Sequence, residues 1–150
     1  MKINIPVSSL LHDKSPEVWT VTPQASVFDA IKLMAAHNIG ALPVVETGAL
    51  VGIFTERDYT RKIALHGKTS KDTKVAEVLS DSVLAVTPEN SVEECMRLMT
   101  QHRVRHLPVV QHDELVGIIS IGDLVNWTIS AQECAIAQME QYITGSMAPS

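Results

Sequence analysis

An internal repeat with a constant spacing of 65 residues restricts the possible folds of this chain more than any other feature. When residues 21–60 are aligned with residues 86–125 without a gap, 17 of the 40 positions are identical. The matches form three blocks: Val21-Thr22-Pro23 with Val86-Thr87-Pro88, Leu42–Val45 with Leu107–Val110, and Leu50–Ile53 with Leu115–Ile118. A chain of 150 residues, the size of one compact domain, is therefore expected to contain two copies of one supersecondary unit.

Each copy has the pattern of a helix, a hairpin and a second helix. Ser26 and Ser91 are suitable N-caps for amphipathic helices of about three turns, because apolar residues recur on one face after each serine. Two short apolar runs then predict a hairpin in each copy, residues 41–45 with 50–54 and residues 107–110 with 115–119. Thr55 and Ser120 are placed to begin further helices, over residues 56–65 and from residue 121 onward.

Neither copy alone can bury the apolar face of so small a sheet, so the two copies should pack against each other. The expected fold class is mixed α and β, with two pseudo-symmetric β-α-β-β-α units packed through their sheets. Residues 67–74 read as a surface linker, and the last helix should continue through Trp127 and Ile136 toward Tyr142, with Gly145 as its end. The expected boundaries are 8–68 and 78–130 for the units and 131–145 for a helical extension.

Charge and cysteine content narrow the class of protein. The net charge of −5, with no Lys or Arg after Arg105, argues against non-specific nucleic-acid binding, which depends on many cations neutralising phosphates. Asn4 and Pro6 interrupt the opening stretch, so neither a signal peptide nor a membrane span is expected there. Two cysteines, Cys95 and Cys134, are too few for a disulfide scaffold. A cytoplasmic location is expected.

The repeated pattern resembles a known family. The run Ile39-Gly40-Ala41-Leu42-Pro43-Val44-Val45, followed by Leu50-Val51-Gly52-Ile53-Phe54-Thr55-Glu56-Arg57-Asp58, is similar to a cystathionine-β-synthase-type (CBS) domain, and residues 86–125 resemble a second one. The resemblance covers roughly residues 8–130. It implies a stand-alone Bateman module, in which two CBS domains leave two pseudo-symmetric clefts for an adenosine compound: AMP first, and also ATP, ADP or NAD. It further implies a non-enzymatic sensor that forms a homodimer and regulates a partner protein still to be identified.

The family's ligand motif is a hydroxylic residue, two further positions and an aspartate. It corresponds here to Thr55-x-x-Asp58 and Ser120-x-x-Asp123. A carboxylate can accept hydrogen bonds from both ribose hydroxyls, and a helix N-terminus favours a phosphate. The same pattern is also a capping box, which satisfies backbone N–H groups with no ligand present, so both interpretations stay open.

The resemblance also places adenine against two strand segments. They are Ile39, Gly40, Ala41, Leu42 and Pro43 in the first copy, and Val104, Arg105, His106, Leu107 and Pro108 in the second. The alternative is that these are ordinary core strand residues.

Other candidates for ligand contact lie nearby. Arg103, Arg105 and His106 make the second copy more basic than the first, and the sequence leaves open which cleft Arg105 serves. Arg57, which has Gly122 as its counterpart, is either a phosphate ligand or an exposed arginine at a helix start. Thr22 and Thr87 either contact a ligand or serve only as turn residues.

Other functions find less support in the sequence. Six histidines are scattered along the chain, and a helix end is expected between His102 and His106, so no metal site is expected. No Walker-type or Gly-x-Gly-x-x-Gly loop is present, and neither cysteine has an evident base, so enzymatic catalysis is disfavoured. A ligand-free dimerisation module is the main alternative to a sensor, because four apolar residues could form an adhesive face on the last helix: Val125, Ile129, Ile136 and Met139.

Overall fold

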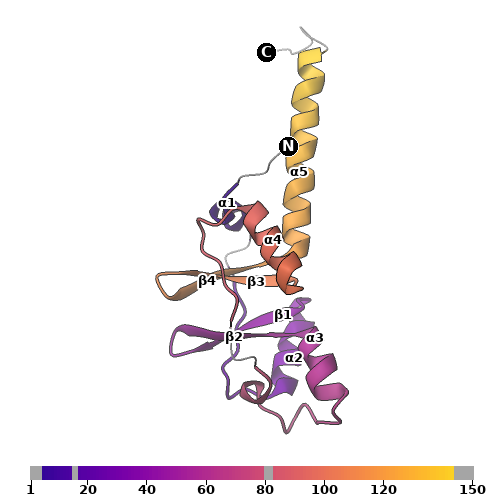
Figure 1. Ribbon diagram of the computed structural model, residues 1–150. Helices are drawn as coiled ribbons and strands as arrows, with labels where there is room; N and C mark the ends of the chain where they lie inside the picture. The colour runs from indigo at the N-terminus through magenta and orange to yellow at the C-terminus, as the bar shows by residue number, and fades with distance from the viewer. Residues whose placement is uncertain (1–4, 15–16, 80–82, 144–150) are drawn as a thin grey trace.

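The computed structural model describes residues 5–14, 17–79 and 83–143 (Figure 1). Gly145, the expected end of the last helix, lies outside these residues. The helices and strands follow in the order α1 (Val7–Asp13), α2 (Val27–His37), β1 (Ala41–Glu46), β2 (Ala49–Thr55), α3 (Glu56–Asp58), η1 (Tyr59–Ala64), η2 (Val75–Val78), α4 (Val92–His102), β3 (His106–Gln111), β4 (Glu114–Ser120) and α5 (Ile121–Ile143).

The two copies fold in the same way, as the sequence repeat predicts. Strands β1 and β2 pair antiparallel with Leu42 opposite Phe54, and β3 and β4 pair with Leu107 opposite Ile119. Both hairpins have a register shift at the same place, after Val44 in one and after Val109 in the other. A single parallel bridge adds the Val-Thr-Pro segment to each hairpin, through Val21 and through Val86.

The first helix of each copy begins at the predicted serine. The hydroxyl of Ser26 accepts a hydrogen bond from the backbone N–H of Asp29 at 3.0 Å, and Ser91 does the same for Glu94 at 3.0 Å. Helices α2 and α4 both end on a residue in the left-handed conformation, Asn38 and Arg103, each with φ of 53°. This turn redirects the chain into the following strand.

The second helix of the first copy differs from its expected form. A single helix is predicted over residues 56–65, but α3 has only three residues and continues as the π-helix η1. The wider turn places Ile63 in the core, where it is 1% exposed, and brings Lys62 Nζ within 2.9 Å of the carbonyl oxygen of Val78. These tertiary contacts offset the weaker helical geometry.

Each core is completed by a segment from outside the aligned repeat. Val7 and Leu10 of α1 are buried in the core of the second copy, with Val92, Leu107 and Leu124. The segment after the linker does the same for the first copy, since Val75 and Val78 of η2 pack with Phe54 and Ile63. Thus α1, at the start of the chain, belongs to the core of the second copy.

The copies pack through their hairpins, with the helices on the outer faces (Figure 1). This confirms the expected face-to-face arrangement. The repeated glycines Gly52 and Gly117 leave space for leucines from the added segments. A Cβ atom at Gly117 would lie 2.7 Å from Cδ2 of Leu11, and one at Gly52 would lie 2.9 Å from Cδ2 of Leu79.

Candidate functional site

A cleft of about 400 Å³ lies where three parts of the chain meet. The segment after α1 forms one wall, the turn from α2 into β1 forms the second, and the second copy contributes the start of β3 and the junction of β4 with α5. The lining residues are Lys14, Glu17, Val18, Trp19, Asn38, Ile39, Gly40, Ala41, His106, Ile118, Ser120 and Asp123. The cleft therefore depends on both copies being packed together.

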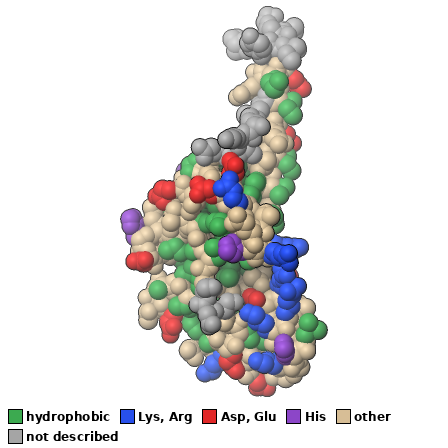
Figure 2. Space-filling view, viewed as in Figure 1, with side chains coloured by type: hydrophobic (Ala, Val, Ile, Leu, Met, Phe, Trp, Pro, Cys, Tyr) green, Lys and Arg blue, Asp and Glu red, His purple; other side chains and the backbone are tan. Residues whose placement is uncertain are grey.

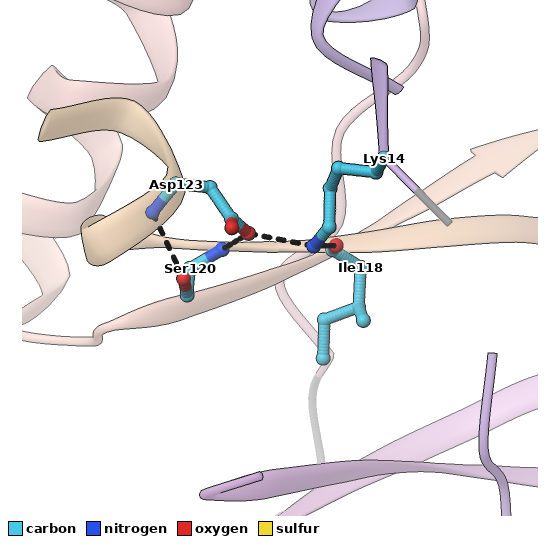
Figure 3. Close-up of polar contacts among 4 residues, drawn as sticks. All are labelled: Lys14, Ile118, Ser120 and Asp123. Atoms are coloured by element: carbon cyan, nitrogen blue, oxygen red, sulfur yellow. Dashed lines mark hydrogen bonds and ion pairs between the residues drawn. The ribbon is translucent and has the colours of Figure 1, made fainter. Parts of the chain in front are cut away.

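Asp123 is the centre of the polar contacts in this cleft (Figure 3). Its Oδ2 accepts hydrogen bonds from the backbone N–H of Ser120 at 2.8 Å and from Lys14 Nζ at 2.6 Å. The hydroxyl of Ser120 in turn accepts from the backbone N–H of Asp123 at 3.1 Å, which completes a capping box. Lys14 also donates to the carbonyl oxygen of Ile118 at 2.8 Å and so ties the segment after α1 to β4.

These contacts set the protonation states of the cleft. Burial alone would raise the pKa of Asp123, but the hydrogen bonds from Lys14 and the Ser120 N–H outweigh burial and hold the pKa below its ordinary value. Burial lowers the pKa of His106, although the charge of Asp123 opposes this effect. At neutral pH Asp123 is therefore ionised and the imidazole of His106 is neutral.

The opposite wall presents an aromatic group and open backbone. The ring of Trp19 stacks on that of His37, with centroids 3.6 Å apart and planes inclined by 14°. Gly40 faces His106 across the cleft, and a Cβ atom at Gly40 would lie 3.6 Å from Cε1 of that ring. The missing side chain at Gly40 keeps the backbone of this turn accessible to a flat ligand.

The equivalent turn of the first copy has different partners. Thr55 and Asp58 also form a capping box, with the backbone N–H of Asp58 donating to Oγ1 of Thr55 at 3.1 Å. The cation beside Asp58 is Lys62 from the same helical segment, with Nζ 3.6 Å from Oδ1. Arg57 Nη1 donates to the carbonyl oxygen of Arg103 at 3.1 Å. This contact places the basic segment around Arg103 beside the Thr55–Asp58 turn.

A second hollow of about 270 Å³ lies beside η1 and η2. It is lined by Lys62, His66, Lys68, Glu77, Val78 and Leu79. None of the site residues predicted from the sequence lines it.

The predicted site residues fall into three groups. Those that line the large cleft are Ile39, Gly40, Ala41, His106, Ser120 and Asp123. Those that lie in the Thr55–Asp58 turn are Thr55, Arg57 and Asp58. Arg105 is exposed, and its carbonyl oxygen accepts from the backbone N–H of Ile121 at 2.8 Å.

The predicted site residues of the third group make contacts that stabilise the fold, in strands, in the core or in turns. Leu42, Pro43, Leu107 and Pro108 are buried strand residues, and Val104 packs against the second core. Thr22 and Thr87 lie in turns: the carbonyl oxygen of Thr22 accepts from Ala25 at 3.1 Å, and the N–H of Thr87 donates to Oδ1 of Asn90 at 2.8 Å.

Several residues of the cleft have no signal in the repeat. Lys14, Glu17, Val18 and Trp19 lie before the aligned region, and the spacing of 65 residues places Leu79 and Leu84 opposite Lys14 and Trp19. Asn38 and Ile118 also line the cleft. A helix end in the left-handed conformation could have drawn attention to Asn38, whose type is common at such positions.

Comparison with known proteins decides the family. The model of the CBS domain matches residues 7–65 and 75–130. The chain belongs to the CBS domain family.

Relatives of this tandem CBS chain are found in plants and bacteria. It is 42% identical over 133 residues to the CBS domain-containing protein CBSX3, mitochondrial, of Arabidopsis thaliana. The match covers 85% of this chain and 64% of the length of that protein. Among solved structures, a candidate signal-transduction protein with CBS domains from Burkholderia ambifaria is 48% identical, with a TM-score of 0.81 over 85% of this chain and 96% of that one.

A hexameric CBS-CP12 protein from bloom-forming cyanobacteria is a further structural neighbour. It is 28% identical with a TM-score of 0.72, and the match covers 99% of this chain and 88% of that one. Together, the family and these relatives support a regulatory module with two CBS domains. Within the described ranges, no helix combines the length and apolar character that crossing a bilayer requires.

Proposed function

We propose that this CBS pair is a regulatory module that binds an adenine nucleotide, AMP in the first place, in the cleft at Asp123. The observation that carries the proposal is the meeting of an ionised carboxylate, a cation and an open backbone turn in one cleft built from both copies. Its volume of about 400 Å³ lies within the range of small-molecule pockets.

Each part of a nucleotide has a suitable partner in this cleft. The contacts to Asp123 from the described residues go to Oδ2, which leaves Oδ1 to accept from a ribose hydroxyl. The turn at Gly40 and the ring of Trp19 offer backbone and aromatic surfaces to the base. Lys14 is the single lysine or arginine among the lining residues, which also include Glu17 and Asp123, so a monophosphate meets less repulsion there than the triphosphate of ATP. ADP, ATP and NAD are the competing ligands.

The proposed role is binding without turnover. The thiol of Cys95 is buried, and burial raises its pKa to about 11, which makes it a poor nucleophile. The side chain of Cys134 lies outside those described. A ligand that joins the two copies would stabilise one arrangement of the pair, and a partner protein would respond to that arrangement. A cytoplasmic location stays a prediction.

Calorimetric titration with AMP, ADP, ATP and NAD tests the proposal. The wild-type chain should bind AMP most tightly, and Asp123→Asn should weaken this affinity at least tenfold, or about 1.4 kcal/mol. Asparagine can still accept the hydrogen bonds of the cap, so the fold should persist. Asp58→Asn makes the same change in the first copy and should alter the affinity by less than about twofold. A folded wild-type chain that binds none of the four compounds would refute the proposal.

Assembly without a ligand is the second candidate. It is favoured by the partners that both carboxylates already have, since Asp58 and Asp123 each combine a capping box with a lysine. We propose self-association in either case, supported by the hexameric CBS-CP12 neighbour and by the exposed apolar residues of α5. A wild-type mass equal to that of the monomer at high concentration, measured by light scattering, would exclude it.

A further inference from the structure

Helix α5 extends well beyond the body of the molecule (Figure 1). It has 23 residues and is therefore about 35 Å long. Leu124 is buried in the second core, and Trp127 packs against that core. From Ile129 to Gln141, every side chain that the structure describes is exposed. Isolated helices are marginal in water, so the outer part of α5 is a segment that a packing partner would stabilise.

The exposed apolar residues of α5 follow a heptad pattern. Val125, Ile129, Ile136 and Met139 are between 47% and 62% exposed, and Figure 2 shows hydrophobic side chains in a row along this helix. With Gln132 included, the intervals are four, three, four and three residues, which is the a/d spacing of a coiled coil. This row lies roughly 130° around the helix from the face that carries Leu124 and Trp127. The row is thus a second face of α5, separate from the one that packs on the body.

We propose that α5 pairs with α5 of a second copy as a parallel, in-register, two-stranded coiled coil. The proposal rests on the self-association proposed above and names its surface and orientation. Ile129 and Ile136 occupy the a positions, where β-branched residues favour two parallel strands. Val125, Gln132 and Met139 occupy the d positions.

The charges of α5 select the parallel orientation. Glu133 and Glu140 both occupy e positions, and the g positions hold Thr128, Ala135 and Tyr142. In a parallel pair, e positions of one helix face g positions of the other, so no two carboxylates meet. In an antiparallel pair, e positions face each other and the glutamates would repel.

Gln132 selects both the register and the second copy as the partner. It is the one polar residue among the five positions of the row from Val125 to Met139. In a parallel, in-register pair the two Gln132 side chains share a layer, where each amide can donate to the other and accept from it. Any shifted or antiparallel pairing would place this amide against apolar side chains, at the cost of unsatisfied polar groups. A polar core residue of this kind specifies one alignment.

Sedimentation equilibrium of the full chain tests the proposal with matched variants. The double variant Ile129→Glu/Ile136→Glu should convert a dimer into a monomer and weaken association at least a hundredfold. The control Ser130→Glu/Ala137→Glu adds the same charges at exposed b positions and should remain dimeric. Thermal unfolding of both variants checks that the CBS pair is intact.

Cysteine crosslinking tests the orientation. In a Cys134→Ser background, Met139→Cys should form a disulfide between copies under mild oxidation, because a parallel pair brings the two d positions together.

The outcomes distinguish the separate parts of the proposal. A wild-type chain that is a monomer would contradict self-association itself, and the exposed face of α5 would then serve a different partner that carries positive charge. A dimer that survives Ile129→Glu/Ile136→Glu would overturn only the α5 interface. A dimer that this double variant dissociates, but that Met139→Cys fails to crosslink, would overturn the parallel orientation.

Discussion

Lys14 Nζ lies 2.6 Å from Oδ2 of Asp123, although the two residues are 109 positions apart in the chain. The lysine comes from the segment that follows α1, and the aspartate comes from the first turn of α5. Their contact closes the cleft on one side and neutralises the carboxylate that the proposed ligand would use. The nucleotide must therefore share Asp123 with Lys14 or displace it.

Replacing Lys14 should change the electrostatics of the cleft more than the stability of the fold. Lys14→Met should raise the pKa of Asp123, because the largest favourable contact to the ionised form is lost. The side chains are 32% and 26% exposed, so the free energy of unfolding at pH 7 should fall by no more than about 1 kcal/mol.

This loss should depend on pH in a defined direction. The pKa of Asp123 is lower in the folded than in the unfolded state, so the stabilisation is present above its ordinary value of 3.8 and is lost as the pH falls through the folded value. The variant and the wild type should therefore converge in strong acid. NMR titration of the carboxyl carbon and urea unfolding measure the two effects, with Lys32→Met as a surface control. An unchanged pKa of Asp123 would argue against the contact.

His106 should make the CBS pair less stable as the pH falls from 7.5 to 5.5. Burial lowers its pKa below the ordinary value of 6.5, so the unfolded chain takes up a proton before the folded chain does, and stability falls with the pH. His106→Gln should remove this part of the dependence, whereas His66→Gln, at an exposed position, should not. Urea unfolding at several pH values gives the comparison. Parallel stability profiles for His106→Gln and the wild type would contradict the prediction.

Gly117 and Leu11 should show coupled effects on stability. Gly117→Ala places a methyl group 2.7 Å from Cδ2 of Leu11, so overpacking should cost about 1 kcal/mol even though alanine suits a strand better than glycine. In a Leu11→Ala background the same change should be neutral or stabilising, because the clashing atom is gone. A double-mutant cycle by urea denaturation measures the coupling. Additive effects of the two changes would show that Leu11 does not restrict this position.

Trp19 should report ligand binding in the cleft at Asp123. The chain has two tryptophans, and Trp19 lines the cleft whereas Trp127 packs against the second core. If AMP enters the cleft, the fluorescence of Trp127→Phe should still respond, and that of Trp19→Phe should not. The reverse pattern would place the ligand elsewhere. Because His37 stacks on Trp19, the unliganded emission should also change when His37 is replaced by Ala.

Most of the fold could be predicted because each copy carries strong local signals. Ser26 and Ser91 are the predicted N-caps of α2 and α4, and the runs that contain Leu42 and Leu107 form the expected hairpins. Helix α1 was not expected, because its residues precede the aligned repeat and its partners, Val92 and Leu107, lie far along the chain. The π-helix at Tyr59–Ala64 depends on tertiary contacts of Ile63 and Lys62, which local patterns do not contain.

The site could be predicted only in part, for a similar reason. Ser120, Asp123 and Gly40 lie inside the repeat, where the resemblance to CBS domains points to them as site residues. Lys14 and Trp19 reach the cleft from a segment whose counterpart in the second copy holds leucines, so comparing the copies hides them. The unequal partners of Asp58 and Asp123, Lys62 from the same helical segment and Lys14 from the far end of the chain, became visible only in three dimensions.

Helix α1 precedes the first repeat but completes the core of the second, whereas η2 precedes the second repeat but completes the core of the first. This arrangement affects the order in which the two halves can fold during synthesis. The first half has every residue of its own core cluster once Leu79 has left the exit tunnel, since Val75 and Val78 lie directly after the linker. Val7 and Leu10 are synthesised before the first repeat, but the last of their buried core neighbours, Leu124, emerges only at the end of the second repeat. The apolar side of α1 therefore lacks its core partners while the first repeat and most of the second are translated, and the second half can complete its core only after both repeats have been made.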